Sequence, residues 1–183
     1  QRGVARPQSG GFDIGAFESS CTITCPANIT VANDPNQCGA VVTYPAPTTT
    51  GVCGAITCAP ASGSFFPVGT TTVNCAAVVD ATCSFTVTVN DTQAPTITCP
   101  GSITKFTDSG QLGATVNPGS PVALDNCPVI TITGVRSDGK ALNALYPVGV
   151  TIITWKATDT GGNMATCGQS IAIMVPSGQR HRP

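Results

Sequence analysis

Charged side chains are scarce in this sequence. Its 183 residues hold 8 lysines and arginines and 9 aspartates and glutamates, which gives a formal net charge of -1. Nucleic-acid-binding proteins need a basic face that neutralises phosphates, so this balance argues against a nucleic-acid partner. The longest apolar run, near residues 171–175, is far short of the roughly 20 residues that cross a membrane, and we expect no membrane span.

Side chains that could perform catalysis are also few. The sequence has one histidine, His181, and one glutamate, Glu18, and neither lies inside a predicted domain beside a partner. No Ser/His/Asp order on a suitable scaffold and no glycine-rich phosphate loop after a predicted strand is found. The sequence therefore predicts a protein that is not an enzyme.

Cysteine and turn residues are what the sequence does contain. Aromatic residues make up 5%, whereas there are 10 cysteines, 20 glycines and 15 prolines. Many cysteines beside few aromatics indicate an oxidising compartment, where disulfides stabilise a small core. Zinc is the alternative, because Cys53, Cys58, Cys75 and Cys83 could supply four thiolates. Their spacing lacks paired C-x2-C knuckles, so the prediction is a disulfide-bonded extracellular or cell-surface protein.

An internal repeat divides the chain. The pentapeptide TITCP at residues 22–26 recurs at 96–100, and FPVGTTTVNC at 66–75 resembles YPVGVTIITW at 146–155. The connector between the two copies, NDTQAP at 90–95, is short and ends in proline. Such a connector predicts a stiff joint between two copies of one unit.

Both copies have the pattern of short β-strands. Segments such as 84–89 and 150–156 alternate polar and apolar residues, and Pro, Gly, Asn and Asp bound them. No stretch shows a sustained 3.6-residue apolar period. We therefore predict an all-β fold of two tandem Ig-like antiparallel β-sandwiches, with Trp155 and Phe85 in their cores. The expected parts are an extended N-terminal arm at 1–20, domains at 21–93 and 94–176, and a C-terminal tail at 177–183.

The order of motifs in the two copies resembles the hyalin repeat (HYR) domain. The pattern CP-x-NIT-V, G-x-C, DNC, FPVG-TTV, ATD-x-x-GN and C-x-FTVTV-x-DT-x-AP runs from Cys25 through Thr92 in the first copy. The second copy carries it at Cys99-Pro100, Asp125-Asn126-Cys127, Tyr146-Pro147-Val148-Gly149, Ala157-Thr158-Asp159 with Gly162-Asn163, and Cys167. The resemblance covers residues 21 to about 176. It implies an extracellular, Ig-like, non-enzymatic module of adhesive, matrix and bacterial surface proteins.

A different resemblance covers the first 20 residues. QRGVARPQSGGFDIGAFE is similar to the DIGA[FY]E-type end of bacterial secreted right-handed parallel β-helix proteins, which implies a bacterial source. Within it, Phe12, Ile14 and Ala16 alternate with Asp13 and Gly15, as in a half-buried strand. Such an arm could add to the sheet edge of a neighbouring subunit as a donor strand. The alternative is a disordered or locally packed terminus.

Disulfide pairing follows partly from the HYR resemblance. The resemblance implies the bridges Cys25–Cys83 and Cys38–Cys53 in the first copy and Cys99–Cys167 in the second. An opening strand that runs parallel to the final strand supports the first-to-last pairs. Cys58 and Cys75 lie on predicted neighbouring strands, which predicts a cross-strand bridge.

Two cysteines are then left over. Cys21 occupies the place of Pro95, and Cys127 has no partner because Leu112 replaces the cysteine of G-x-C in the second copy. An odd thiol in a secreted protein indicates an intermolecular bond. We therefore expect Cys21 and Cys127 to join neighbouring protomers.

Oxygen-bearing side chains gather in the loops of the second copy. In an Ig-like unit, the loop with Asp125 and Asn126, the loop with Asp159 and Asn163, and the linker with Asp91 should reach the same end. Ca²⁺ accepts hard oxygen ligands in irregular geometry, so we expect a Ca²⁺ site at this end. The first copy lacks the set and has a shorter final hairpin. The alternative is that these residues only cap turns.

These features predict an extracellular structural or adhesive protein. Its disulfide-crosslinked tandem would act as a stiff spacer, or as the subunit of a surface fibre or filament joined through its terminal arm. Its partners would be copies of itself or other surface and matrix proteins. The alternative is a carbohydrate- or protein-binding accessory module of a larger secreted bacterial protein. Few expected exposed aromatics argue against sugar binding, which favours stacking platforms.

Overall fold

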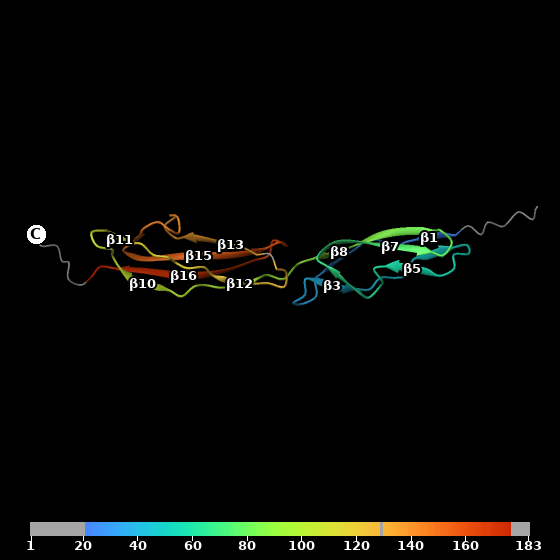
Figure 1. Ribbon diagram of the computed structural model, residues 1–183, viewed down its shortest axis with the longest axis horizontal. Coiled ribbons are helices and arrows are strands. Elements are labelled where there is room, and N and C mark those ends of the chain that lie inside the picture. The colour runs from blue at the N-terminus through green and yellow to red at the C-terminus, as the bar shows by residue number, and fades with distance from the viewer. Residues whose placement is uncertain (1–20, 129, 177–183) are drawn as a thin grey trace, which may run out of the picture. The chain divides into compact units, whose positions relative to one another are not determined.

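The described part of the chain is built from β-strands alone. The computed structural model describes residues 21–128 and 130–176, and every regular element within them is a strand (Figure 1). Within those residues, no helix is long and apolar enough to cross a membrane. The predicted all-β fold of tandem β-sandwiches is confirmed. The expected N-terminal arm and C-terminal tail lie outside the described residues.

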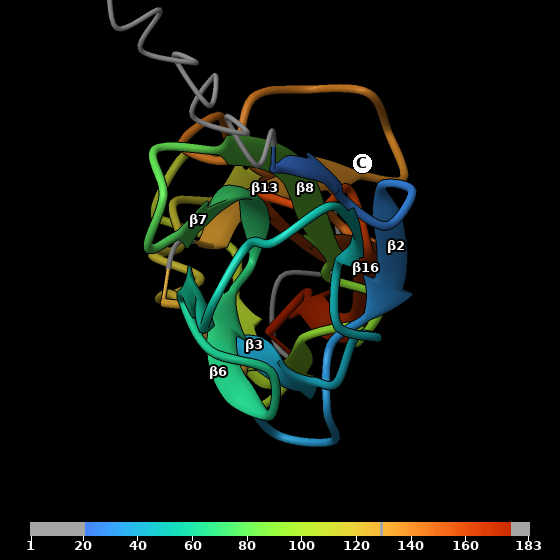
Figure 2. The same ribbon diagram turned by 90° about the vertical axis from the view of Figure 1, so that its right-hand side faces the viewer.

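The first repeat contains one four-stranded sheet and two two-stranded sheets. The larger sheet has the order β2-β8-β7-β5, and the smaller ones are β1-β4 and β3-β6; β3 and β6 are labelled side by side in Figure 2. The strands are β1 (Thr22–Thr24), β2 (Ile29–Ala32), β3 (Gly39–Val42), β4 (Thr48–Thr50), β5 (Ile56–Ala59), β6 (Ser64–Pro67), β7 (Gly69–Ala77) and β8 (Thr82–Asn90).

The second repeat has the same layout. Its larger sheet has the order β10-β16-β15-β13, and β9 pairs with β12 and β11 with β14. The strands are β9 (Thr96–Thr98), β10 (Ile103–Phe106), β11 (Gly113–Ala114), β12 (Val122–Leu124), β13 (Ile130–Arg136), β14 (Tyr146–Pro147), β15 (Gly149–Asp159) and β16 (Met164–Met174). The repeat in the sequence is therefore a repeat of strand order.

Alternation along the long strands builds each core. In β7 and β8, residues such as Val73 and Val87 face inward and are fully buried. Tyr44 packs edge-on against Phe85, with ring centroids 5.0 Å apart. In the second repeat, Trp155 is 5% exposed. Its core consists of Ala114, Val116, Tyr146, Ile153, Trp155, Ile171 and Ile173.

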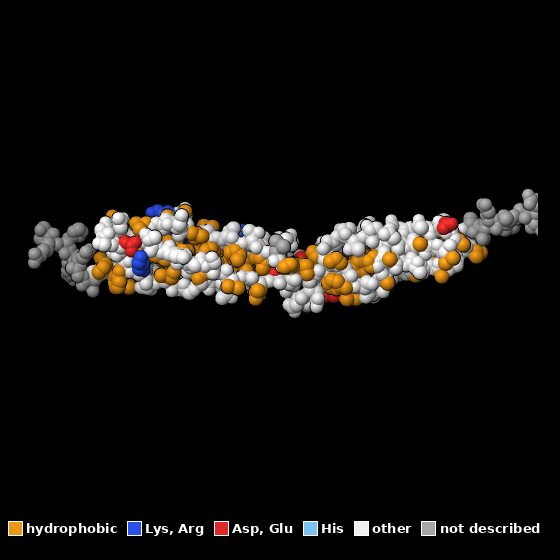
Figure 3. Space-filling view, in the orientation of Figure 1, with side chains coloured by type: hydrophobic (Ala, Val, Ile, Leu, Met, Phe, Trp, Pro, Cys, Tyr) orange, Lys and Arg blue, Asp and Glu red, His pale blue; other side chains and the backbone are white. Residues whose placement is uncertain are grey.

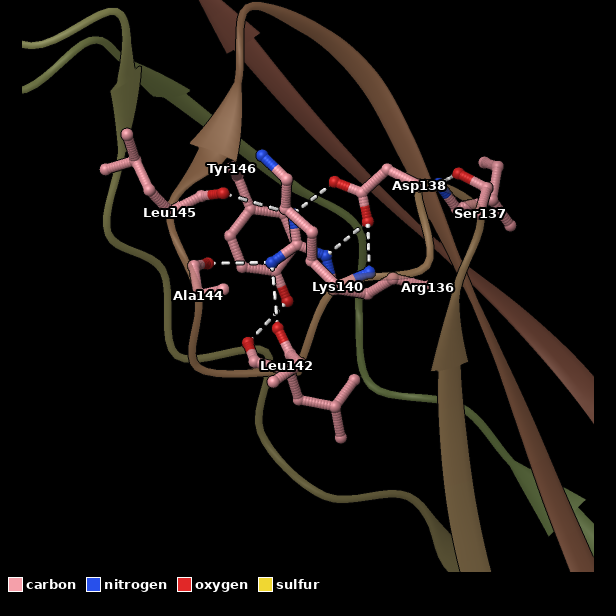
Figure 4. Close-up of polar contacts among 10 residues, drawn as sticks. Arg136, Ser137, Asp138, Lys140, Leu142, Ala144, Leu145 and Tyr146 are labelled. Atoms are coloured by element: carbon pink, nitrogen blue, oxygen red, sulfur yellow. Dashed lines mark hydrogen bonds and ion pairs between the residues drawn. The ribbon is translucent and has the colours of Figure 1, made fainter.

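A buried arginine organises the long connection between β13 and β14 (Figure 4). Arg136 ends β13 and is 2% exposed. Its guanidinium lies 3.7 Å from the centroid of the Tyr146 ring. All five of its N–H donors have acceptors: Nε and Nη2 donate to the Asp138 carboxylate, Nη1 to the Ala141 and Ala144 carbonyls, and Nη2 to the Leu145 carbonyl.

Charged groups are otherwise sparse. Few acidic or basic side chains lie on the face seen in Figure 3. Two ion pairs form among the described residues, Lys105–Asp108 and Arg136–Asp138. The hydrogen bond from Lys105 lowers the pKa of Asp108 below its ordinary value, and the hydrogen bonds from Arg136 do the same for Asp138.

All ten cysteines form disulfides, and three bridges agree with the predicted pairing. Cys25–Cys83 and Cys99–Cys167 each connect the opening segment of a repeat to its last strand. β10 and β16 run parallel side by side, which brings the segment that precedes β10 next to the start of β16. Cys58–Cys75 crosses between the paired strands β5 and β7, where the two residues are direct partners in the register.

The predicted pairing Cys38–Cys53 is wrong. Cys53 bonds to Cys21, because β1 and β4 pair antiparallel with Thr22 opposite Thr50 and so bring Cys21 beside the loop that follows β4. Cys38 bonds to Cys127 instead. The proposed intermolecular role of Cys21 and Cys127 is therefore also wrong, since both are bonded within the chain.

The division of the chain into compact units agrees with the observed partners of Cys38 and Cys53. Contacts divide the chain into two units, and the second comprises Thr30–Val41, Phe65–Thr70 and the described residues from Thr88 to 176. Cys38 and Cys127 both belong to this second unit, whereas Cys53 belongs to the first, which contains Val42–Ser64. Sequence homology between the copies could not show that a loop of the first repeat packs in the second unit.

Candidate functional site

Acidic and amide side chains from three segments meet in the second compact unit. Asp91 directly follows β8, and Asp125 and Asn126 directly follow β12. Asp159 is the last residue of β15, and Asn163 precedes β16. The five residues predicted from the sequence as calcium ligands thus form one cluster, but their oxygens differ in how they are hydrogen-bonded.

The alternation of β15 explains the burial of Asp159. Thr151, Ile153, Trp155 and Ala157 face the interior of the second repeat, and the same phase continues to Asp159, which is 7% exposed. In the first repeat, β7 has nine residues against eleven in β15 and ends at Ala77. The longer hairpin therefore extends the inward-facing row far enough to place a carboxylate at its end.

Asp159 and Asn163 satisfy each other. The Asn163 backbone N–H donates to Asp159 Oδ1 at 2.8 Å, and Asn163 Nδ2 donates to Asp159 Oδ2 at 2.9 Å. Nδ2 also donates to the backbone carbonyl of Asp91 at 3.1 Å. Gly161 also lies close to this carbonyl: a Cβ added at Gly161 would be 2.9 Å from the Asp91 oxygen. This half of the cluster fixes the hairpin tip against the segment at Asp91.

Asp91, Asp125 and Asn126 leave oxygens without donors. Asp91 Oδ1 accepts from Gln93 N at 3.2 Å and from Asn126 Nδ2 at 3.3 Å, and Asp125 Oδ2 accepts from Cys127 N at 3.1 Å. The remaining oxygens, Asp91 Oδ2, Asp125 Oδ1 and Asn126 Oδ1, are buried and accept no hydrogen bond from any described residue. A buried oxygen without a donor is costly, so this half of the cluster has unused binding capacity.

The two carboxylates also lie close together without a cationic side chain. Carboxylate oxygens of Asp91 and Asp125 are within 4.8 Å of each other. Asp91 is 6% exposed. Neither ion pair of the described residues includes Asp91 or Asp125. Like charges at this distance repel in a low-dielectric environment, and nothing in the described protein neutralises them.

A loop of the first repeat forms one wall of the site. Asn126 Nδ2 donates to the Gln37 backbone carbonyl at 3.0 Å, and the neighbouring residues form the bridge Cys38–Cys127. The turn at Asp34 holds this loop, since Gln37 N donates to the Asp34 carbonyl and the Asp34 side chain accepts from Val41 N. Gln37 was not among the residues predicted from the sequence; its one signal there is the pair of cysteines, Cys38 and Cys127, left without an intradomain assignment that holds.

A cavity of about 260 Å³ opens beside the unpaired oxygens. The polar side chains in its lining permit ordered water, because a water site needs several hydrogen-bonding partners and room for the molecule. The residues that line it include Asn36, Gln93, Thr96, Leu124, Asp125 and Asn126.

A second group of side chains with metal-ligand atoms consists of cysteines that are already bonded to one another. Sulfur atoms of Cys25, Cys75 and Cys83 lie within 4.8 Å of one another, but each is in a disulfide. A bridged sulfur is not a thiolate, and metal ligation by cysteine needs the thiolate. The described residues therefore provide no cysteine site for zinc.

The second repeat also contains a parallel strand pair beside its first-to-last bridge. β10 and β16 are paired in parallel over four residues, from Ile103 opposite Ile171 to Phe106 opposite Met174. A pull that enters before Cys99 and leaves after β16 passes through the Cys99–Cys167 bridge, so β10 stays outside the loaded path. The Cys99–Cys167 bridge lies at the start of the same pair. Phe12, Ile14 and Ala16, the candidate donor-strand residues, lie outside the described residues.

Comparison with known proteins gives one family and several relatives. The HYR domain profile matches residues 19–89 and 90–173. Hyalin of Strongylocentrotus purpuratus is 30% identical over 177 residues, which cover 87% of this chain and 14% of that protein. Hyalin of Lytechinus variegatus is 29% identical over 192 residues, covering 93% of this chain and 36% of that protein.

A third relative matches over a shorter stretch. Sushi, von Willebrand factor type A, EGF and pentraxin domain-containing protein 1 of Rattus norvegicus is 34% identical over 89 residues, which cover 49% of this chain and 2% of that protein. The chain spans at most 36% of the length of these three relatives. Among solved structures, the protocadherin GammaB4 extracellular domain has a TM-score of 0.41 at 14% identity, with 86% of this chain and 33% of that chain covered. Human protocadherin-24 EC1-2 has a TM-score of 0.36 at 12% identity, with 85% and 97% covered.

Proposed function

Since the chain belongs to the HYR domain family, we propose that it is an extracellular, non-enzymatic module of the adhesion type whose task is mechanical. Five disulfides in a chain of this size support an oxidising, extracellular location. The tandem acts as a stiff spacer or as the subunit of a surface fibre. A bacterial source and assembly through the N-terminal arm remain predictions.

The observation that carries this proposal is the first-to-last bridging of both repeats. Cys25–Cys83 closes a separation of 58 residues, and Cys99–Cys167 closes one of 68. A force along the chain passes through each bridge instead of through the residues between its cysteines. Those residues cannot add length even if their sheets unfold, so each repeat behaves as a short, almost inextensible link.

Single-molecule force spectroscopy on the full chain, held at its two ends, tests this. The oxidised chain should release little length on unfolding. The double variant Cys25→Ser/Cys83→Ser should release only about 30 Å more, because the bridges Cys21–Cys53 and Cys58–Cys75 still bypass most of the loop and only about nine further residues come under load, at about 3.5 Å each.

The bridge Cys58–Cys75 supplies the matched control. It lies inside the loop that Cys25–Cys83 closes, with a separation of 17 residues. The double variant Cys58→Ser/Cys75→Ser should therefore release no more length than the oxidised wild type. Full extension of the oxidised wild type would contradict the mechanical role.

The accessory-module alternative has less support from the described surface. A cavity of about 510 Å³ in the second repeat is lined by Trp155, Pro118 and Asn143 among others, but Trp155 is 5% exposed and presents no open face for stacking on a sugar. Microscopy of the native material decides between the roles. Filaments or regular surface arrays labelled by an antibody support the structural role, whereas capture on a glycan array without assembly supports the alternative.

A further inference from the structure

We propose that the cluster of Asp91, Asp125 and Asn126 binds a divalent cation, and that this cation is Ca²⁺. The ligands are the three side-chain oxygens without donors: Asp91 Oδ2, Asp125 Oδ1 and Asn126 Oδ1. Only three of the five predicted ligands are therefore assigned to the ion. Asp159 and Asn163 hydrogen-bond to each other, and Asn163 supports the backbone of Asp91. The inference goes beyond the mechanical role and does not depend on it.

Burial of Asp91 is the first step of the argument. The residue is 6% exposed, and one of its two carboxylate oxygens receives no hydrogen bond from a described residue. Burying an ionised carboxylate without a counter-charge costs several kcal/mol. A second carboxylate, Asp125, lies beside it, so the cost of burying both is larger than that of either alone. A dication removes both penalties.

Distance is the second step. The carboxylate oxygens of Asp91 and Asp125 are within 4.8 Å of one another. Ca²⁺ binds oxygens at about 2.3–2.6 Å, so two ligands on opposite sides of the ion are about 5 Å apart and adjacent ligands are closer. One ion can therefore bridge the two carboxylates without a large movement of the backbone.

Ligand chemistry selects the ion. Two carboxylates and one amide are hard oxygen donors, and the sulfur of Cys127 is excluded because it is bridged to Cys38. Three protein ligands leave places that water fills, for which the adjacent cavity of about 260 Å³ has room. Ca²⁺ tolerates such an irregular set, whereas Mg²⁺ requires near-octahedral geometry at a shorter distance.

Thermal unfolding and calorimetric titration of the full, oxidised chain test the proposal. With Ca²⁺ at about one hundred times its Kd, the Tm should be about 5–10 °C higher than in EDTA. The titration should give one ion per chain. Mg²⁺ at the same concentration should raise the Tm by less than half as much.

Asp91→Asn and Asp125→Asn separate binding from a structural role. Each should abolish most of the Ca²⁺ response. In EDTA each should leave the Tm unchanged or higher, because it removes like-charge repulsion while the amide keeps an acceptor oxygen. Asp80→Asn is the matched control: Asp80 is exposed and lies in the first unit, so this variant removes the same charge and should keep the full response.

Several outcomes would overturn the assignment. An equal wild-type Tm in Ca²⁺ and EDTA, with no heat of binding, would show that the cluster binds no Ca²⁺. A full response in Asp91→Asn and Asp125→Asn would place the ion elsewhere, and an equal Mg²⁺ response would refute the choice of Ca²⁺. None of these results changes the force measurements that test the mechanical role.

Discussion

Arg136 shows how a single charged residue can be part of the core. Burying a guanidinium normally costs free energy, and the cost is offset only when its donors are satisfied. Here five N–H groups reach one carboxylate and three backbone carbonyls, and the flat face of the group covers Tyr146. Arg136 therefore supplies hydrogen-bond donors to backbone carbonyls of the irregular connection between β13 and β14, which have no strand partner there.

Replacement of Arg136 by lysine should be costly even though the charge is kept. Lysine has three donors at one point and cannot form the planar fork, so backbone carbonyls such as that of Ala144 lose their partner. We expect Arg136→Lys to lower the free energy of unfolding by about 2–4 kcal/mol in chemical denaturation. The reverse exchange at an exposed strand position, Lys156→Arg, should change it by less than about 0.5 kcal/mol. Equal effects of the two exchanges would contradict the role given to the fork.

At the scale of strands, the pairing of β13 with β15 depends on a glycine. Gly134 is the register partner of Trp155, and a Cβ at Gly134 would lie 2.6 Å from the indole ring. Gly168 on β16 pairs with Thr154, and a Cβ there would meet nothing within 4 Å. A methyl group at Gly134 would therefore clash with Trp155, whereas a methyl group at Gly168 would clash with nothing.

Alanine substitution at these two positions should give effects of opposite sign. Gly134→Ala should destabilise the second repeat by about 1–3 kcal/mol, because Trp155 must shift within a packed core. Gly168→Ala should be neutral or stabilise it by up to about 1 kcal/mol, since the unfolded chain loses freedom and nothing clashes. Urea denaturation of the oxidised chain followed by tryptophan fluorescence measures both. A neutral Gly134→Ala would show that the ring position is not set by this contact.

At the scale of the molecule, the two tyrosines connect the stability of both repeats to alkaline pH. Tyr44 and Tyr146 are the two tyrosines of the chain. Burial raises the pKa of each phenol above its ordinary value of 10.0. Their hydroxyls donate to the carbonyls of Pro60 and Leu142. Ionisation would remove both donors and place a charge at the core.

The sign of the pH dependence follows from the raised pKa values. A phenol with a folded-state pKa above its unfolded value stabilises the fold fully below about pH 10, and this contribution is lost as the pH rises further. Phenolate absorbance should therefore appear above pH 10 and together with loss of the circular dichroism signal of the sheets. In Tyr44→Phe, all remaining absorbance reports Tyr146. Ionisation of both tyrosines near pH 10 with the fold intact would contradict the prediction.

The sequence by itself determined the two-copy β architecture. Alternation at residues such as Val87 and Ile171 and turn residues between the segments are local properties, and local properties specify strands and their inward faces. The first-to-last bridges Cys25–Cys83 and Cys99–Cys167 could also be predicted, because the HYR resemblance implies them and an opening strand that runs parallel to the last strand supports them. That Asp91, Asp125 and Asn126 lie near one another could be predicted as well, since loop positions follow from strand order.

Only the tertiary structure decided which atoms meet. It gave Cys38 the partner Cys127, because the loop at 30–41 packs in the second compact unit and not with Cys53. It also separated the satisfied Asp159 from the unsatisfied Asp91. Ten cysteines and a low net charge describe a crosslinked extracellular chain, but hydrogen bonding and packing between distant segments determine its bridges and its unpaired oxygens. These depend on three-dimensional contacts that composition and spacing do not encode.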